Sequence, residues 1–219
     1  MFCLRRSKAM ITLVLADDHP STRAGLRTIL DGTTDIQVVG EAEDGFNAEK
    51  LVELLRPRIL LLDLIMPGPR PAEIERRVRN KWPETVTLVL TAHDRDAYLV
   101  EMMAEGVAGY LTKNESSERL INAIRRAAQG DMIFTEEQFT RALNWHRAIG
   151  NKWESLSERE KEILHLLGQG VDIGVMAGAL GISSKTVSHH LSSIYKKLGV
   201  NSRPEAMAWV QKYLSDNLE

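Results

Sequence analysis

Hydrophobic residues follow two different periods over the first 130 residues of the chain. Short, nearly continuous apolar runs occur at Ile11–Ala16, Ile36–Ala42, 59–63, Val86–Thr91 and 107–111. Between them lie segments with helical periodicity, at about 21–30, 46–55, 71–82, 94–105 and 116–129. Continuous apolar runs are typical of strands buried on both faces of a parallel sheet. The alternation therefore predicts a doubly wound α/β domain with a five-stranded parallel sheet over residues 10–130.

The rest of the chain shows no strand pattern. Residues 131–153 mix aromatic and polar side chains, and we interpret them as a linker that contains a short helix. Residues 154–219 predict a small all-α domain of four helices, with capping boxes at Ser157/Glu160 and Ser202/Glu205. Within it a short helix, a turn at Gly181 and a longer helix form the helix-turn-helix pattern.

Composition narrows the class of protein. The 219 residues carry 28 Lys and Arg against 30 Asp and Glu, and a single cysteine, which excludes a disulfide framework and a cysteine-ligated zinc site. No apolar run reaches the roughly 20 residues that a membrane-spanning helix needs. The basic residues at 1–9 precede only a short apolar run, so we interpret them as a leader before a buried strand. We expect a soluble, cytoplasmic protein without a membrane partner.

Five polar residues stand at the ends of predicted strands. Asp17 and Asp18 follow the first strand, Asp63 ends the third, Thr91 ends the fourth and Lys113 follows the fifth. The carboxyl ends of parallel strands share one edge, so these side chains should converge. Clustered carboxylates require a cation, and oxygen ligands favour Mg²⁺.

A carboxylate beside Mg²⁺ can act as a nucleophile toward phosphorus, and Asp63, alone at a central strand end, is our candidate. Lys113 and Thr91 would then contact the transferred phosphoryl group. The alternative is that these acids only cap the following helices, and that His19 begins an ordinary turn.

The segments VLADDHP, LLLDLIMP, LTA and GYLTK resemble the receiver domain of bacterial two-component response regulators, with its flavodoxin-like fold. The resemblance implies that Asp63 is phosphorylated by a sensor histidine kinase or a small phosphodonor. It also implies a Mg²⁺ site and a group of phosphate-binding and switch positions. The metal ligands would be Asp17, Asp18, Asp63 and the backbone carbonyl of Ile65, and the phosphate and switch positions Thr91, Ala92, Tyr110 and Lys113. One departure is Gly68-Pro69-Arg70-Pro71, whose prolines should stiffen the loop and delay the next helix.

The third helix of the second domain has two distinct faces. Val187, Leu191, Ile194 and Leu198 form an apolar stripe that should face the core. The opposite face is polar or basic and lacks acids, which suits a DNA major groove, although a solvated amphipathic helix is the alternative. The DNA-binding candidates on this helix and at its N-terminus are Ser183, Ser184, Lys185, Thr186, Ser188, His189, Ser192 and Lys196.

Residues 156–206 closely resemble the LuxR-type helix-turn-helix, and with the receiver they give the architecture of NarL/FixJ-type response regulators. The resemblance implies base contacts by Ser188, His189 and Ser192, and phosphate contacts by Lys185, Thr186 and Lys196. It also implies a homodimer on operator DNA, with RNA polymerase as a further candidate partner. In the last helix Trp209, Val210 and Tyr213 could form a dimer contact or pack in the core.

The second helix of this domain departs from the family, because Gly174 and Gly178 lie inside it. Each glycine costs a helix about 1 kcal/mol relative to alanine. Two explanations remain open at this point: the domain has low stability, or its neighbours pack tightly against these positions.

Three functions compete on the sequence alone. The first is a DNA-binding regulator switched by phosphorylation of Asp63. The second is a regulator whose receiver acts without phosphorylation, which equal operator affinity with and without a phosphodonor would favour. The third is a Mg²⁺-dependent phosphohydrolase, which normally needs an acid two residues after the nucleophile, where this chain has Ile65.

Overall fold

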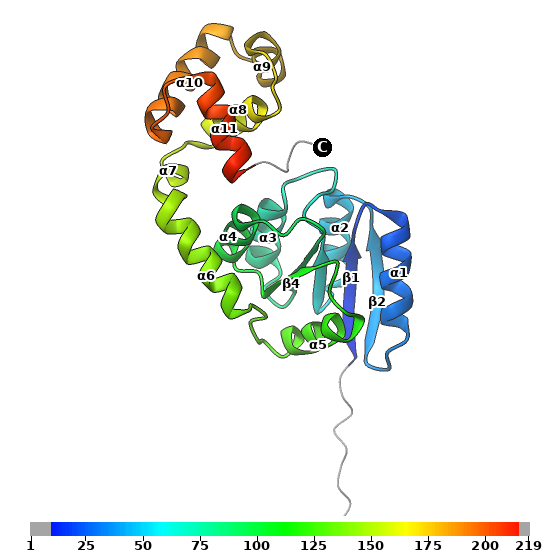
Figure 1. Cartoon of the computed structure of the whole chain (residues 1–219). Helices are drawn as coiled ribbons and strands as arrows, with labels where there is room; N and C mark the ends of the chain where they lie inside the picture. The colour runs from blue at the N-terminus through cyan, green and yellow to red at the C-terminus, as the bar shows by residue number, and fades with distance from the viewer. Residues whose placement is uncertain (1–9, 215–219) are drawn as a thin grey trace, which may run out of the picture. The chain divides into compact units, whose positions relative to one another are not determined.

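The computed structural model describes residues 10–214 (Figure 1). The predicted leader at residues 1–9 lies outside the described residues. The chain divides between Phe139 and Thr140 into two compact units, which are described separately below. Among residues 10–214, no helix combines the length and the apolar character that a membrane crossing requires.

The first unit contains a five-stranded parallel sheet, as predicted. Its strands are β1 (Ile11–Ala16), β2 (Ile36–Ala42), β3 (Ile59–Leu62), β4 (Val86–Thr91) and β5 (Gly109–Thr112). They lie in the order β2-β1-β3-β4-β5, so the order reverses between β1 and β3. Ala16 pairs with Leu62, and Thr91 pairs with Thr112. Strands β1 and β3 therefore end together, as do β4 and β5, and Asp17, Asp63 and Lys113 are the first residues past three of those ends.

Helices cover both faces of this sheet (Figure 1). They are α1 (Pro20–Asp31), α2 (Gly45–Leu55), α3 (Pro71–Lys81), α4 (Asp96–Glu105) and α5 (Ser117–Ala128). One core cluster joins α2, α3 and α4 to alternate strand residues such as Val14 and Leu60. The other joins α1 and α5 to the intervening residues such as Leu13 and Leu61. The double coverage explains the continuous apolar runs, because the residues of the central strands are buried by helices on both faces.

The loop after β3 agrees with the expectation from its prolines. Helix α3 begins at Pro71, which occupies the first turn, where its missing N–H costs no hydrogen bond. Gly68 has φ +109°, and a Cβ there would lie 3.1 Å from the Phe46 ring and 3.3 Å from the Gly45 nitrogen. A glycine is therefore required at this turn, both by the backbone conformation and by the space available.

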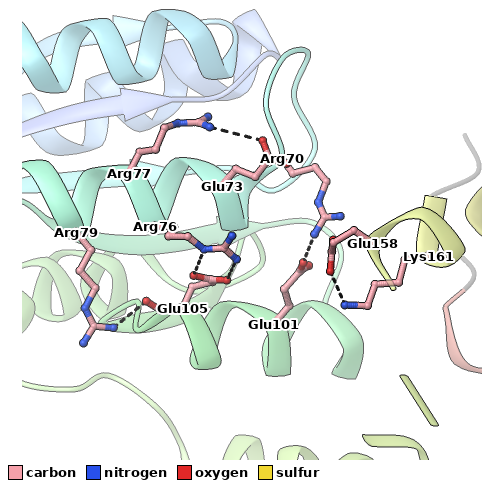
Figure 2. A network of polar contacts seen from close by, with 9 residues as sticks. All are labelled: Arg70, Glu73, Arg76, Arg77, Arg79, Glu101, Glu105, Glu158 and Lys161. Carbon is pink, nitrogen blue, oxygen red and sulfur yellow. Dashed lines mark hydrogen bonds and ion pairs between the residues drawn. The ribbon is translucent and has the colours of Figure 1, made fainter. Parts of the chain in front are cut away.

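Arginines of helix α3 and its N-cap connect it to both neighbouring helices, and Figure 2 shows the contacts with α4. Arg76 makes a two-pronged contact with Glu105, and Arg70 lies 2.6 Å from Glu101, both glutamates being on α4. On the other side, Arg77 pairs with Glu49 of α2. Several exposed ion pairs of this kind add little stability each but together fix the register of the three helices.

The predicted linker differs from the expectation in two ways. Its first residues belong to the sheet edge, since Ile133 donates its N–H to the Ala108 carbonyl at 2.6 Å and forms a bridge with Gly109. Its remainder is helical almost throughout, as α6 (Glu136–Trp145), a π-helical turn (His146–Gly150) and α7 (Asn151–Glu154). The prediction of one short helix was therefore too limited. Ala142, Trp145 and Ile149 are buried at helical spacing, a stripe that the surrounding polar residues obscured.

The second unit contains α8 (Glu158–Gly168), α9 (Ile173–Leu180), α10 (Ser184–Leu198) and α11 (Arg203–Tyr213). The capping box of Ser157 and Glu160 is present in full. At α11, Ser202 accepts from the Glu205 N–H, but the Glu205 carboxylate accepts from the Asn201 N–H instead of completing the predicted box. Asp172 occupies the N-cap position of α9, but its carboxylate makes no capping hydrogen bond.

The glycines of α9 are not explained by tight packing. A Cβ at Gly174 or at Gly178 would meet no heavy atom within 4 Å, and both residues are exposed. Of the two explanations for these glycines, close packing is therefore wrong. Gly174 and Gly178 each carry the conformational cost of glycine in a helix, and no close contact compensates for it.

Candidate phosphoacceptor site and DNA interface

Three carboxylates from remote segments converge at the carboxyl end of the sheet. Asp17 and Asp63 are buried, with 1% and 3% of their surfaces exposed, and Asp18 is half-buried. Ligand atoms of Asp17, Asp18, His19 and Asp63 all lie within 4.8 Å of one another. The predicted convergence of the acids is present. The site lies where the strand order reverses, the usual position for ligands in such sheets.

Lys113 reaches into this group from the end of β5. Its Nζ lies 2.6 Å from Asp63 Oδ2 and 2.9 Å from Asp17 Oδ2. Asp63 Oδ1 accepts the Leu64 N–H at 2.7 Å. Both carboxylate oxygens of Asp63 are therefore held by donors, which fixes the orientation of the carboxylate.

The ionisation of this group reflects its burial. Burial raises the pKa of Asp63, the nearby Asp17 carboxylate raises it further, and Lys113 opposes both effects. Burial alone would lower the pKa of Lys113, but its contacts with Asp63 and Asp17 outweigh burial and raise it. The ammonium therefore stays charged, while the carboxylates gain from any additional positive charge.

The residues present fit a divalent cation. Three carboxylates and one ammonium leave about two negative charges at the site, and the donors are oxygens, which hard ions prefer. Asp17 Oδ2 and Asp18 Oδ1 are buried and accept no hydrogen bond of good geometry, although Lys113 and His19 form ion pairs with them. Those oxygens retain lone pairs for a metal ion. Ile65 lies in the half-buried loop two residues past Asp63.

His19, which only the alternative interpretation considered, as the start of an ordinary turn, lies in the cluster. The backbone N–H of His19 donates to Asp17 Oδ1 at 2.8 Å. The imidazole Nδ1 lies 2.7 Å from Asp18 Oδ1. Its position directly after two aspartates was the only available signal.

The two predicted switch residues are joined through a third residue. Thr91 is fully buried, and its hydroxyl accepts the His93 N–H at 3.0 Å. The Tyr110 hydroxyl donates to the His93 carbonyl at 2.8 Å, with the ring 1% exposed. Ala92, between Thr91 and His93, is exposed. Sequence reasoning found Thr91 and Tyr110 but not His93, because its contribution comes from the backbone and leaves no side-chain signal.

Helix α10 has the two faces that its sequence predicted. Its apolar stripe is buried, with Val187, Ile194 and Leu198 at 0% exposure and Leu191 at 4%. All eight predicted DNA contacts are exposed: Ser183, Ser184, Lys185, Thr186, Ser188, His189, Ser192 and Lys196. Within the described part of the chain, no carboxylate pairs with Lys185 or Lys196, so both ammonium groups face solvent.

Several serines on this face also bond to the helix itself. Ser183 caps α10 by accepting the Thr186 N–H at 3.1 Å. Ser188 and Ser192 donate their hydroxyls to the carbonyls four residues earlier, at 3.0 Å in each case. Their oxygens keep free lone pairs, so these serines present acceptors to a ligand more readily than donors.

Buried polar contacts hold α10 in place. Glu160 of α8, 4% exposed, accepts from Ser193 and from Lys197, both at 2.6 Å. At the far end, Lys152 of α7 donates to the Leu198 carbonyl at 2.8 Å and so caps the C-terminus of α10. The sequence analysis identified Glu160 only as a capping residue and missed its link to α10.

The three residues named for a dimer contact differ in exposure. Trp209 and Val210 are buried, at 8% and 2% exposure, and Tyr213 is half-buried. The rings of Trp209 and Tyr213 lie 5.2 Å apart. Tyr213 is therefore the most accessible of the three.

Two family models match the chain: the response regulator receiver domain over residues 13–125, and the luxR family of bacterial regulatory proteins over residues 154–210. The chain belongs to the NarL/FixJ-type response regulators. This response regulator is 34% identical over 205 residues to the nitrate/nitrite response regulator protein NarL of Escherichia coli (strain K12), covering 92% of this chain and 95% of NarL. It is 32% identical over 215 residues to the transcriptional regulatory protein DegU of Brevibacillus brevis, covering 90% and 91%.

Among solved structures, this response regulator is similar to RcsB from Salmonella enterica serovar Typhimurium, bound to the promoter rprA in the presence of phosphomimetic BeF3⁻. The TM-score is 0.64 and the identity 27%, over 92% of this chain and 98% of RcsB. The flavodoxin-like receiver and the LuxR-type domain predicted from sequence are thus confirmed. The chain is a DNA-binding two-component response regulator of the LuxR family.

Proposed function

We propose that Asp63 accepts a phosphoryl group from a sensor histidine kinase or a small phosphodonor. A carboxylate oxygen attacks phosphorus, the bond to the leaving group breaks, and the leaving group keeps the electron pair. The supporting observation is the contact of Lys113 with Asp63 and Asp17, which places a charged donor beside both the nucleophile and the acid cluster. Lys113 would move from the carboxylates to a phosphoryl oxygen as the charge develops there.

Asp17, Asp18, Asp63 and the carbonyl of Ile65 would hold Mg²⁺, whose positive charge would offset that of the phosphoryl oxygens. The buried oxygens of Asp17 and Asp18 that lack well-formed hydrogen bonds support this assignment. The His19 imidazole contacts the Asp18 carboxylate, which would also bind the ion. The imidazole would therefore turn away when the ion binds.

Thr91 and Tyr110 would report the phosphorylation. The Thr91 hydroxyl would leave the His93 N–H and donate to a phosphoryl oxygen, with the exposed Ala92 N–H as a neighbouring donor. Loss of the bond between the His93 N–H and Thr91 would shift the His93 backbone. The His93 carbonyl, which accepts from the Tyr110 hydroxyl, would shift with it. Phosphorylation thus biases two states of the 92–95 loop and of the strand ends beside it.

The output would be control of transcription at operator DNA, in the cytoplasm where that DNA lies. The outer face of α10 would enter the major groove, with Ser188, His189 and Ser192 on base edges. Lys185, Thr186 and Lys196 would contact phosphates, and Ser183 and Ser184 lie at the helix N-terminus, which favours anions. A homodimer would read two half-sites, with Tyr213 at the contact and Trp209 and Val210 supporting it. RNA polymerase is the candidate partner at the promoter.

The decisive experiment compares the chain with its Asp63→Asn variant, in the presence of Mg²⁺ and a small phosphodonor, by intact-mass spectrometry. We expect one added phosphoryl group in the parent chain and none in the variant. Asp31→Asn, at an exposed carboxylate of α1, is the matched control and should be labelled like the parent. Continued labelling of Asp63→Asn would reject the acceptor assignment.

Operator affinity with and without phosphodonor separates this function from a receiver that acts without phosphorylation. We expect tighter binding when Asp63 is phosphorylated. Repeated turnover of a phosphate ester would instead favour a phosphohydrolase, against which Ile65 argues, because it stands where such an enzyme carries its acid.

A further inference from the structure

Gln138 is a buried polar residue in the first turn of α6, with 8% of its surface exposed. Its Oε1 accepts the Thr135 N–H at 3.0 Å, and its own N–H donates to Thr135 Oγ1 at 3.1 Å. These reciprocal bonds form a capping box that begins the helix. The amide nitrogen on the same side chain, Nε2, donates to the backbone carbonyl of Tyr110 at 2.9 Å.

The segment before Gln138 is already attached to the sheet. Strand β5 lies at the edge of the sheet, so one row of its backbone groups lacks a partner strand. Ile133 uses this edge by its bond to Ala108 and its bridge to Gly109. A Cβ at Gly109 would lie 2.7 Å from Ile133 Cβ, so the approach depends on glycine. The start of the linker is therefore part of the receiver.

Tyr110 thus has contacts on two sides. Its hydroxyl bonds to the His93 carbonyl, beside Thr91, and its own carbonyl bonds to Gln138. Both bonds lie within the first unit. A change at the phosphoacceptor loop that moves Tyr110 therefore reaches the first turn of α6 through one residue. Helix α6 then continues past Phe139 into the second unit of the chain.

We propose that Gln138 is a positioning residue that sets the direction of the linker helix according to the state of Tyr110. This inference rests on the proposed phosphorylation of Asp63. A ten-residue helix is about 15 Å long, so a tilt of about 10° at its first turn moves its last turn by about 2–3 Å. Gln138 thereby couples the receiver to the segment that leads to α7, whose Lys152 caps the recognition helix.

The test separates the Tyr110 bond from the capping box. Gln138→Glu keeps an oxygen that accepts from Thr135 but removes the donor to the Tyr110 carbonyl. Thr135→Val is the matched control, because it weakens the cap and leaves the Nε2 donor in place. Gln138→Met removes the donor without adding a charge and is the second variant in case the glutamate perturbs folding; it also removes the Oε1 acceptor of the cap, and Thr135→Val controls for a weakened cap.

The test measures the operator affinity of the full chain with and without phosphodonor, together with the phosphorylation of Asp63. Relative to the parent, Gln138→Glu and Gln138→Met should lower the phosphorylation-dependent change in affinity at least threefold, with labelling unchanged. Thr135→Val should retain that change within twofold. If both Gln138 variants are fully phosphorylated at Asp63 and still show the same change in operator affinity as the parent, the inference is overturned.

A second readout does not depend on phosphorylation. In the unphosphorylated chain, hydrogen exchange of the Ile133 amide should accelerate at least tenfold in both Gln138 variants, since the segment loses the Gln138 bond that supports its attachment to β5. If the parent chain is not phosphorylated, or its affinity does not respond, the proposed function fails. Unchanged Ile133 exchange in both variants rejects the positioning role by itself.

Discussion

The Tyr110 hydroxyl donates to the backbone carbonyl of His93 at 2.8 Å, and the His93 N–H donates in turn to Thr91. One residue therefore holds the hydroxyl that would meet the phosphoryl group and the aromatic ring that would follow it. A displacement of the His93 backbone would therefore affect the contacts of both Thr91 and Tyr110.

Tyr110→Phe should weaken this connection without emptying the core. The ring stays buried, so the cost is one hydrogen bond, about 1 kcal/mol of unfolding free energy. Phosphorylation of Asp63 should persist. The difference in operator affinity between phosphorylated and unphosphorylated protein should shrink at least twofold. Thermal unfolding and operator titration provide the two measurements.

Tyr98→Phe is the control for this prediction. Burial raises the pKa of Tyr98 to about 12, and among residues 10–214 its hydroxyl has no hydrogen-bond partner. Its removal should leave the phosphorylation response intact. An equal loss of response in both variants would show that the loss of either tyrosine hydroxyl has the same effect, and would contradict a specific role for His93.

The exposed face of α10 predicts two different losses of DNA affinity. His189→Ala should weaken operator binding by about 1–3 kcal/mol and leave random DNA binding nearly unchanged, because base contacts carry specificity. Lys196→Ala should weaken both about equally and reduce the slope of affinity against salt by about one, because a phosphate contact releases counterions.

Gel shifts over a range of salt concentrations measure both effects. His190→Ala changes the neighbouring, half-buried histidine and should change neither. If Lys196→Ala affects only the operator, or His189→Ala affects all DNA alike, the assigned roles are reversed.

Glu160 makes the unfolding free energy of the second unit depend on pH. Burial by itself raises its pKa, but the bonds from Lys197, Ser193 and Ser157 lower it to about 2, from an ordinary 4.5. A lowered folded-state pKa stabilises the protein above the unfolded value, and this stability is lost as the pH falls from about 4.5 to about 2. The shift corresponds to about 3 kcal/mol.

Thermal unfolding of the parent and of Glu160→Gln, followed between pH 2 and pH 7, isolates this contribution. The difference in midpoint should be largest above pH 5 and should disappear near pH 2. Glu162→Gln, at an exposed position of the same helix, should show no comparable dependence. A constant difference between parent and Glu160→Gln at all pH values would contradict the coupling.

The glycines of α9 offer a gain in stability. Gly174→Ala and Gly178→Ala each add a Cβ into open space, and each should raise the unfolding free energy by about 0.5–1 kcal/mol. Gly181→Ala is the opposite control, since its φ of +65° disfavours a Cβ. Urea unfolding should place the first two above the parent and the third below it.

Local periodicity determined much of this protein. Apolar runs and helical stripes gave the strands, the order of the units and the buried face of α10, because the spacing of side chains on a strand or helix is a local property. The meeting of Asp17, Asp63 and Lys113 also followed from sequence, since parallel strands end at one edge and each residue stands directly after its strand.

Tertiary structure alone decided which groups contact one another. Nothing local indicates that the His93 backbone joins Thr91 to Tyr110, that Gln138 reaches the Tyr110 carbonyl, or that Glu160 holds Ser193 and Lys197 of α10. The helical extent of the linker was missed because the sequence did not show that Trp145 and Ile149 are buried, and a buried apolar stripe stabilises a helix more than local propensity does. Such contacts depend on packing between remote segments, which no short window of sequence contains.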